Sequence, residues 1–218
     1  MNDFRANESL SEQIARHIGN MIVNGELKAG DRIQELRIAA ELNVSRGSVR
    51  EAYLILERRY LIEIMPRKGA VVAQLTPAHV KNIYEMNIAL LSLLVKRAAL
   101  EWKDQDLQPF MMLAQEMHQH IQNGEIRRFH DATFEFVRLS HKFTDNVYLT
   151  EMLDNLQPPI ARTYYLLLSK TSDEMQSSLQ AFQTIMEKVA QRDATGAVAA
   201  VEAFGNHLCA LVLLHLAQ

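Results

Sequence analysis

Residues 25–72, the most informative segment of the chain, read GELKAGDRIQELRIAAELNVSRGSVREAYLILERRYLIEIMPRKGAVV. This segment predicts one short helix at about Gln34–Leu42, ended by Asn43, a residue type that tolerates the left-handed backbone conformation. A second helix begins at Ser45, whose hydroxyl can cap it. The apolar face of this second helix holds Val49, Ala52, Tyr53 and Leu56. Two helices joined by so short a turn predict a helix-turn-helix.

The segments on either side complete a small domain. Upstream, Ser9 or Ser11 can cap a helix that ends near Asn24-Gly25. Downstream, the β-branched runs LIEIM and AVVAQL flank Pro66-Arg67-Lys68-Gly69, which predicts a β-hairpin with two cations in its turn. Three helices followed by a hairpin predict a winged helix-turn-helix over residues 1–75.

The rest of the chain, residues 76–218, predicts helices alone. Thr76-Pro77 suits a helix start, because Thr can cap and Pro is tolerated at the first helical position. Helical stretches are expected at about 77–102, 105–122, 125–143, 147–169, 173–192 and 194–216. The fold class is therefore mainly α, with an antiparallel bundle of about six helices behind the winged head. Pro158-Pro159 is expected to kink or split its helix.

Composition narrows the class of protein. The net charge is −3, and residues 1–75 hold 11 basic against 10 acidic residues. This balance excludes a strongly basic protein that covers nucleic acid as histones do. The single cysteine, Cys209, lies in an apolar run and is expected to be a core residue in a reducing compartment. That run spans about ten residues, too short to cross a bilayer. No N-terminal stretch has the pattern of a signal peptide, so the chain is expected to be cytoplasmic, without a membrane partner.

DNA reading is expected at the start of the helix that Ser45 caps. A helix N-terminus presents free N–H groups to phosphate, and serine hydroxyls add further donors. Two arginines four residues apart share one helix face, and each guanidinium can bind guanine or phosphate. The basic hairpin turn would reach the neighbouring groove or backbone. The predicted DNA-binding residues are Ser45, Arg46, Ser48, Arg50, Arg67, Lys68 and Gly69.

Residues 10–74 resemble the winged-helix head of the GntR family of bacterial regulators. The family pattern runs G-x-L-x-P-G-x-x-L-x-E, then L-A, then G-V-S-R-x-P-V-R-E-A-L-x-x-L, then R-x-G-x-x-V. The resemblance implies DNA contacts at Ser45, Arg46, Ser48, Arg50, Lys68 and Gly69. Three positions depart from the family: Leu36 stands where the family often has Arg, Gly47 where Thr or a similar residue is usual, and Tyr60 where a Gly usually ends the helix.

The helical half resembles the FCD-type effector domain of the FadR branch, in its shorter VanR-like subgroup. Many members of this branch bind a metal through one Asp and three His, and the metal often helps to bind a carboxylate effector. The corresponding positions here are Thr133, Val137, Phe182 and Phe204. None of these side chains offers an anionic or imidazole ligand. The sequence therefore predicts no metal and no other cofactor.

An apolar effector cavity is expected in place of the metal site. Where the branch often has Arg and then Glu four residues later, this chain has Asn87 and Leu91. The expected lining is Asn87, Leu91, Thr133, Val137, Phe182, Phe204 and His207, the last lying one turn from Phe204. Two alternatives remain: the cavity binds a hydrophobic effector, or the two Phe side chains fill it. Polar groups such as His130, Asp131 and Glu135 are interpreted as solvated or hydrogen-bonded surface groups.

The predicted function is a sequence-specific DNA-binding regulator, a repressor, rather than an enzyme. It is expected to be a homodimer on a palindromic double-stranded operator, since two-fold symmetry matches two half-sites. A small hydrophobic effector in the bundle would change operator affinity. The alternatives are a metal-dependent carboxylate-sensing regulator and a helical metalloenzyme with an accessory DNA-binding head.

Overall fold

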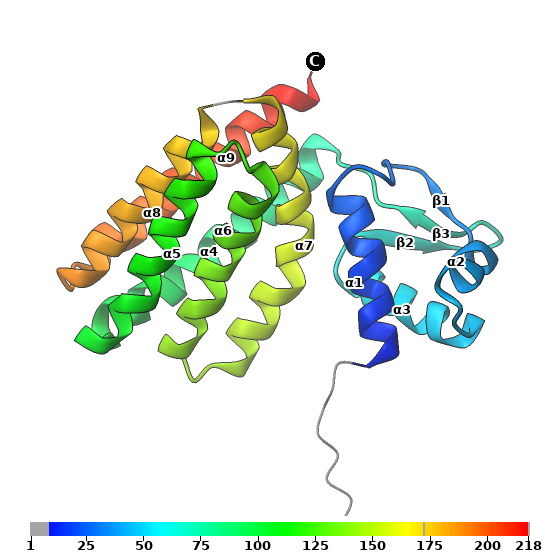
Figure 1. The fold of residues 1–218 in the computed structure, drawn as a ribbon, viewed down its shortest axis with the longest axis horizontal. Coiled ribbons are helices and arrows are strands. Elements are labelled where there is room, and N and C mark those ends of the chain that lie inside the picture. The colour runs from blue at the N-terminus through cyan, green and yellow to red at the C-terminus, as the bar shows by residue number, and fades with distance from the viewer. Residues whose placement is uncertain (1–8, 172, 218) are drawn as a thin grey trace, which may run out of the picture. The chain divides into compact units, whose positions relative to one another are not determined.

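The computed structural model describes residues 9–171 and 173–217, and the chain divides into two compact units between Leu75 and Thr76. The first unit combines three helices with a small sheet, and the second is a helical bundle (Figure 1). Each unit has its own fold, so the two are described in turn.

The three helices of the first unit are α1 (Leu10–Val23), α2 (Glu35–Leu42) and α3 (Arg46–Arg58). Ser9 caps α1 by accepting a hydrogen bond from the Glu12 N–H. Asn43 ends α2 in the left-handed conformation, with φ of 52°. Asn adopts this conformation more readily than most residues, which explains the tight turn into α3. The predicted helix-turn-helix is confirmed.

The sheet holds three antiparallel strands, β1 (Arg32–Ile33), β2 (Ile62–Met65) and β3 (Gly69–Val72), in the order β1-β3-β2. The hairpin β2–β3 is the predicted wing. Strand β1 was not predicted, because two residues are too few to show an alternating pattern. It is held by pairing with β3, and the Tyr53 hydroxyl of α3 donates to the Ile33 carbonyl at 3.2 Å.

The core of this unit lies between the helices and one face of the sheet. Its most enclosed side chains include Ile18, Val49, Ala52, Leu56 and Leu61, each at most 1% exposed. Ile18 belongs to α1, and Leu61 directly precedes β2. The other three belong to α3, so the core holds α3 against α1 and the sheet. Hydrophobic burial of this kind is the main stabilising contribution in a small domain.

Among the described residues, the second unit contains six α-helices and one short 3-10 helix. Their bounds are α4 (Pro77–Glu101), α5 (Asp104–Gln122), α6 (Ile126–Ser140), η1 (His141–Phe143), α7 (Val147–Lys170), α8 (Glu174–Ala190) and α9 (Ala194–Leu216). Thr76, Asn146 and Asp193 cap α4, α7 and α9 with their side chains. The bundle and the number of its helices match the prediction, since local caps and breaks mark the ends.

Helix α7 runs unbroken through Pro158 and Pro159, so of the two predicted outcomes, a kink or a split, the split does not occur. Each proline removes a backbone donor and disfavours the helix by about 3 kcal/mol. Pro159 is buried, and α7 packs against both α4 and α6. We attribute the continuous helix to this packing, a contribution that the local sequence does not reveal.

Helix α9 lies along α4 at very close range. A Cβ added at Gly205 would lie only 2.4 Å from Ile88 Cγ1, so glycine permits this approach. By length and composition, α9 is apolar enough to cross a membrane, with mean hydropathy 1.8 over its best window. This apolar stretch is longer than the ten-residue run considered above, because Ala and Gly extend it. In the bundle, α9 packs against α4 and α8.

Candidate functional sites

The N-terminus of α3 is exposed and well capped. Ser45 accepts a hydrogen bond from the Ser48 N–H at 3.1 Å, and the two hydroxyls lie 2.9 Å apart. Arg46 and Arg50 extend from the same helix, with side chains 56% and 64% exposed. Two guanidinium groups beside free helix-terminal N–H groups suit an anionic backbone and guanine edges.

Glu35 holds both arginines in the structure. Arg46 Nε donates to Glu35 Oε1 at 2.6 Å, and Arg50 Nε donates to Glu35 Oε2 at 2.8 Å. These two hydrogen bonds keep the pKa of the Glu35 carboxyl below its ordinary value, the one from Arg50 having the larger effect. The site prediction omitted Glu35, although the GntR pattern has a Glu at this position.

The wing carries its cations at an exposed turn. Lys68 N–H donates to the Met65 carbonyl at 3.2 Å, and Arg67 has a positive φ of 65°. With Pro66 before Arg67, this is the pattern of a type II turn, whose third position normally favours glycine. Arg67, Lys68 and Gly69 are all exposed. The turn therefore presents two cations to solvent at the tip of the hairpin.

Helix α3 and the wing are tied together. Glu57 Oε1 of α3 accepts a hydrogen bond from the Ile64 N–H of β2 at 3.0 Å. Between them, Tyr60 adopts a φ of 56°, the conformation that explains why the family usually has Gly here. Tyr60 therefore adopts the backbone conformation that the turn requires, although it is not a glycine. Leu36, which replaces the family Arg, is 65% exposed and offers no charge.

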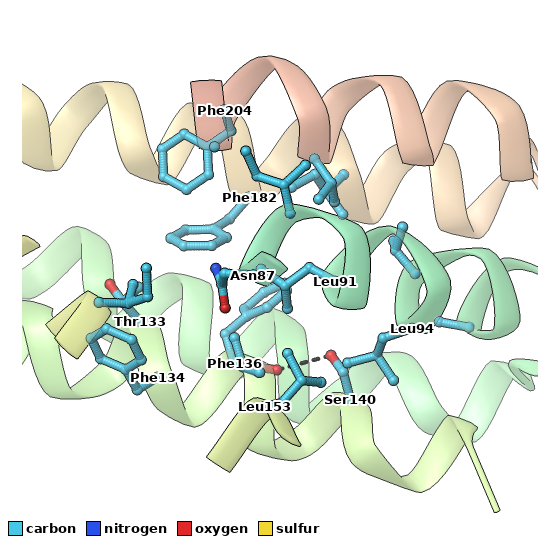
Figure 2. A pocket seen from close by; sticks show the side chains of 18 of the residues that line it. Asn87, Leu91, Leu94, Thr133, Phe134, Phe136, Ser140, Leu153, Phe182 and Phe204 are labelled. Atoms are coloured by element: carbon cyan, nitrogen blue, oxygen red, sulfur yellow. Dashed lines mark hydrogen bonds between the residues drawn. The ribbon is translucent and has the colours of Figure 1, made fainter. Parts of the chain in front are cut away.

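The bundle encloses a cavity of about 150 Å³ (Figure 2). Its walls come from all six α-helices of the unit and from η1. Six of the seven predicted residues line it: Asn87, Leu91, Thr133, Val137, Phe182 and Phe204. The Phe side chains thus line an open space and do not fill it. This geometry favours the first alternative, a cavity that can bind an effector.

A row of aromatic rings forms part of the cavity wall. The ring centroids of Phe110 and Phe136 lie 5.1 Å apart, those of Phe136 and Phe182 5.0 Å, and those of Phe182 and Phe204 5.3 Å. All four rings line the cavity. Edge-to-face and tilted aromatic contacts at this spacing are favourable beyond their burial. The sequence prediction missed Phe110 and Phe136, because only the packing of α5 on α6 brings them to the cavity.

Comparison with known families agrees with both units. Residues 10–72 match the bacterial regulatory proteins of the gntR family, and residues 82–207 match the FCD domain. The chain belongs to the GntR family of transcription regulators, with an FCD domain.

Relatives of this GntR-family chain are also regulators. An uncharacterized HTH-type transcriptional regulator YdhC from Bacillus subtilis is 29% identical over 96% of this chain and 94% of its own length. The HTH-type transcriptional repressor RspR of Escherichia coli is 26% identical over 76% of this chain and 72% of its own. The gluconate operon transcriptional repressor of B. subtilis is 28% identical over 73% and 65%. The metalloenzyme alternative is wrong, since the family and these relatives are transcription regulators.

Solved structures share the fold. Escherichia coli McbR/YncC has a TM-score of 0.83, with 18% identity over 96% of this chain and 99% of its own. A putative GntR regulator from Rhodococcus sp. RHA1 has a TM-score of 0.76, with 17% identity over 93% and 97%. The winged head followed by a helical domain is therefore a fold seen in solved structures.

His207 does not line the cavity of this FCD domain, so that prediction is wrong. Its side chain is 48% exposed, and its Nε2 lies 3.2 Å from Glu174 Oε2. Glu174 is only 3% exposed at the start of α8. The imidazole meets this buried carboxylate beside the cavity, an interaction between two helices that spacing along α9 alone cannot reveal.

The residues at the four family metal positions do not fit a divalent cation. Thr133 already donates its hydroxyl to the Phe129 carbonyl at 3.1 Å, and Val137, Phe182 and Phe204 have no donor atoms. The cavity lining contains one carboxylate, Asp154, which is exposed, and no His or Cys among the described residues. A divalent ion prefers several anionic or imidazole ligands at one point.

His130 is buried, contrary to its interpretation as a surface group. It is 5% exposed, and its Nε2 lies 3.0 Å from the Ala161 carbonyl of α7. Its ring stacks against Tyr164 at 5.9 Å between centroids. Its neighbour Asp131 is 65% exposed. His130 therefore joins α6 to α7 and also pairs with Asp131, its Nδ1 lying 3.2 Å from Asp131 Oδ1. Glu135 pairs with Arg138 instead.

Proposed function

We propose that this GntR-family protein is a repressor that binds a palindromic operator as a homodimer and releases it in response to a small apolar effector. The observation that carries the proposal is the exposed pair Arg46 and Arg50 at the capped N-terminus of α3. Such a pair suits bidentate reading of guanine in a major groove. Two cations at the wing turn suit the phosphate backbone beside it. We expect this regulator to act in the cytoplasm.

Repression is supported by the names of relatives. RspR of E. coli and the gluconate operon regulator of B. subtilis are both called transcriptional repressors. An effector releases a repressor by binding more tightly to the orientation of the heads that does not fit the operator, which lowers operator affinity.

The effector is proposed to enter the bundle cavity without a metal or other cofactor. A cavity of about 150 Å³ lined by Leu, Val and Phe side chains has the size and polarity of one that holds a benzene ring. Because no group of metal ligands lines the described part of the cavity, the effector's own contacts must supply its affinity.

The dimer is proposed to form through α4. Met86, Leu93 and Leu100 are exposed by 52%, 41% and 59%, and they follow one another at seven-residue intervals. Residues at this spacing form a single stripe along a helix. A second copy of the same stripe is a self-complementary partner in a two-fold dimer, which would place two heads for two half-sites. We propose that this second copy covers the α4 stripe.

The test is binding to DNA selected by the protein itself. Sequencing the genomic DNA that the protein retains should give a short inverted repeat. Arg46→Ala and Arg50→Ala should each weaken binding to that repeat by ~1–3 kcal/mol. Arg128→Ala is the control, since it removes an equally exposed arginine from α6. Retained affinity in both α3 variants would contradict the proposed reading helix.

A further inference from the structure

Two buried tyrosines line the cavity and differ in their hydrogen bonding. Tyr84 on α4 is 1% exposed, and Tyr164 on α7 is 2% exposed. The Tyr84 hydroxyl is paired with Thr163 Oγ1 at 3.0 Å. The Tyr164 hydroxyl has no hydrogen-bond partner in the described part of the chain. A buried hydroxyl left without a partner is uncommon and disfavours folding.

The hydroxyls near Tyr164 donate their hydrogens to other groups. Thr133 donates to the Phe129 carbonyl at 3.1 Å, and Ser178 donates to Glu174 Oε1 at 3.3 Å. Burial raises the pKa of the Tyr164 hydroxyl. The group therefore stays protonated at neutral pH and is available as a donor. Tyr164 and its neighbour Thr133 both line the cavity.

The charge of the lining limits the class of ligand. Of the described residues that line the cavity, none is Lys, Arg or His, and the single ionisable carboxylate is Asp154. A carboxylate or phosphate in this space would lose its water without gaining a cation, which is strongly unfavourable. An uncharged ligand meets no such penalty. The Asn87 amide, which extends from α4 among the apolar side chains, is one of several neutral polar groups of the lining (Figure 2).

We propose that the Tyr164 hydroxyl donates a hydrogen bond to an uncharged, mainly apolar effector of about one aromatic ring that carries an acceptor oxygen, as in a ketone, aldehyde or ester. This inference rests on the proposed effector function and names its ligand class. The row of Phe rings supplies the apolar wall for the ligand's ring, and Tyr164 supplies a polar contact that orients it. Pockets of this type combine a large apolar surface with few polar anchors.

The test compares three probes of similar shape: acetophenone, ethylbenzene and benzoate. Their dissociation constants are measured by calorimetry or NMR titration on the full chain and on Tyr164→Phe. Tyr164→Phe should weaken acetophenone about five-fold, the effect of one hydrogen bond. It should leave ethylbenzene unchanged or slightly tighter. Benzoate should bind neither protein.

Tyr84→Phe is the matched control. It removes a hydroxyl from a second buried tyrosine of the same cavity, but one that already has a protein partner. The ratio of acetophenone to ethylbenzene affinity should therefore stay at the wild-type value. Tyr164→Phe removes an unpaired hydroxyl, so the variant protein should melt at or above the wild-type temperature. This measurement checks that the variant is folded.

Two results would overturn the inference alone. One is an acetophenone-to-ethylbenzene ratio that Tyr164→Phe leaves unchanged, and the other is benzoate binding as tight as acetophenone. Either would leave the effector proposal standing, because a probe would still bind the cavity. Binding of no neutral probe would overturn both. Probes that bind as described without changing operator affinity would support the ligand class and contradict the effector proposal.

Discussion

Glu35 and Arg50, separated by 15 positions in the chain, are joined by a hydrogen bond of 2.8 Å from the guanidinium Nε to the carboxylate. The other carboxylate oxygen accepts from Arg46 at 2.6 Å. One acidic residue of α2 therefore orients both arginines proposed to read DNA, and it also partly neutralises them. Orientation favours specific base contacts, and neutralisation weakens attraction to any phosphate backbone.

Glu35→Gln should separate these two effects. Removing the negative charge should raise affinity for random duplex DNA roughly two- to five-fold, the range of one exposed ion pair. Affinity for the operator should rise less or fall, because the arginines lose their fixed positions. The ratio of operator to random affinity should therefore decrease, measured by fluorescence anisotropy at constant salt. Glu41→Gln, which breaks the exposed Arg37 pair on the same helix, is the control. An unchanged ratio in Glu35→Gln would rule out an orienting role.

The same carboxylate makes stability depend on pH in a defined direction. Hydrogen bonds from Arg50 and Arg46 lower the pKa of Glu35 from its ordinary value of 4.5. A lowered carboxyl pKa stabilises the folded state above the unfolded pKa, and this contribution is lost as pH falls through the folded pKa. The stability difference between wild type and Glu35→Gln should be constant near neutral pH and shrink below pH 4.5. Urea unfolding at a series of pH values measures it, and a difference that grows on acidification would have the wrong sign.

Replacing Tyr60 by glycine should increase the stability of the winged head. Its φ of 56° is strained for a residue with a Cβ, and its side chain is 50% exposed. Tyr60→Gly should stabilise the head by about 0.5–1 kcal/mol, since relief of strain exceeds the added chain entropy. Tyr60→Ala removes the same ring but keeps the Cβ, so it should not stabilise. Equal unfolding free energies for the two variants would show that the backbone angle is not the cause.

Leu93→Glu should disrupt the proposed dimer. It places a charge at the centre of the α4 stripe, where burial against a second copy would be unfavourable. Light scattering coupled to gel filtration should show the mass of one chain, and operator affinity should fall with it. Met111→Glu changes a similarly exposed apolar residue on α5 and should leave the dimer intact. A wild-type chain that is monomeric at micromolar concentration would contradict the proposed assembly.

Gly205→Ala should loosen the contact between α9 and α4. The added Cβ would lie 2.4 Å from Ile88 Cγ1, and overpacking of this kind disfavours folding by about 1–3 kcal/mol. Ile88→Ala removes the opposing atoms, so the double variant should lose less stability than the sum of the two single variants. Thermal unfolding of the four proteins provides the comparison. Additive losses would mean that the two residues do not compete for space.

Features decided by neighbouring residues were predictable from the sequence. Ser45 caps α3, Asn43 ends α2 in the left-handed region, and Thr76 with Pro77 begins α4. A cap depends on a side chain and an N–H only three residues away, so its pattern is visible in the chain. The same holds for the hairpin turn of the wing, whose Pro and Gly restrict the backbone locally.

Features that join distant segments needed the tertiary structure. The winged head, the approximate helix bounds and the apolar residues at the family metal positions could all be predicted from the amino-acid sequence. Only the fold decided that Glu35 holds Arg46 and Arg50, that α7 continues through its prolines, and that Tyr164 lacks a partner. Each of these depends on which helices pack together and how closely, and packing sums many weak contacts that no short stretch of sequence contains.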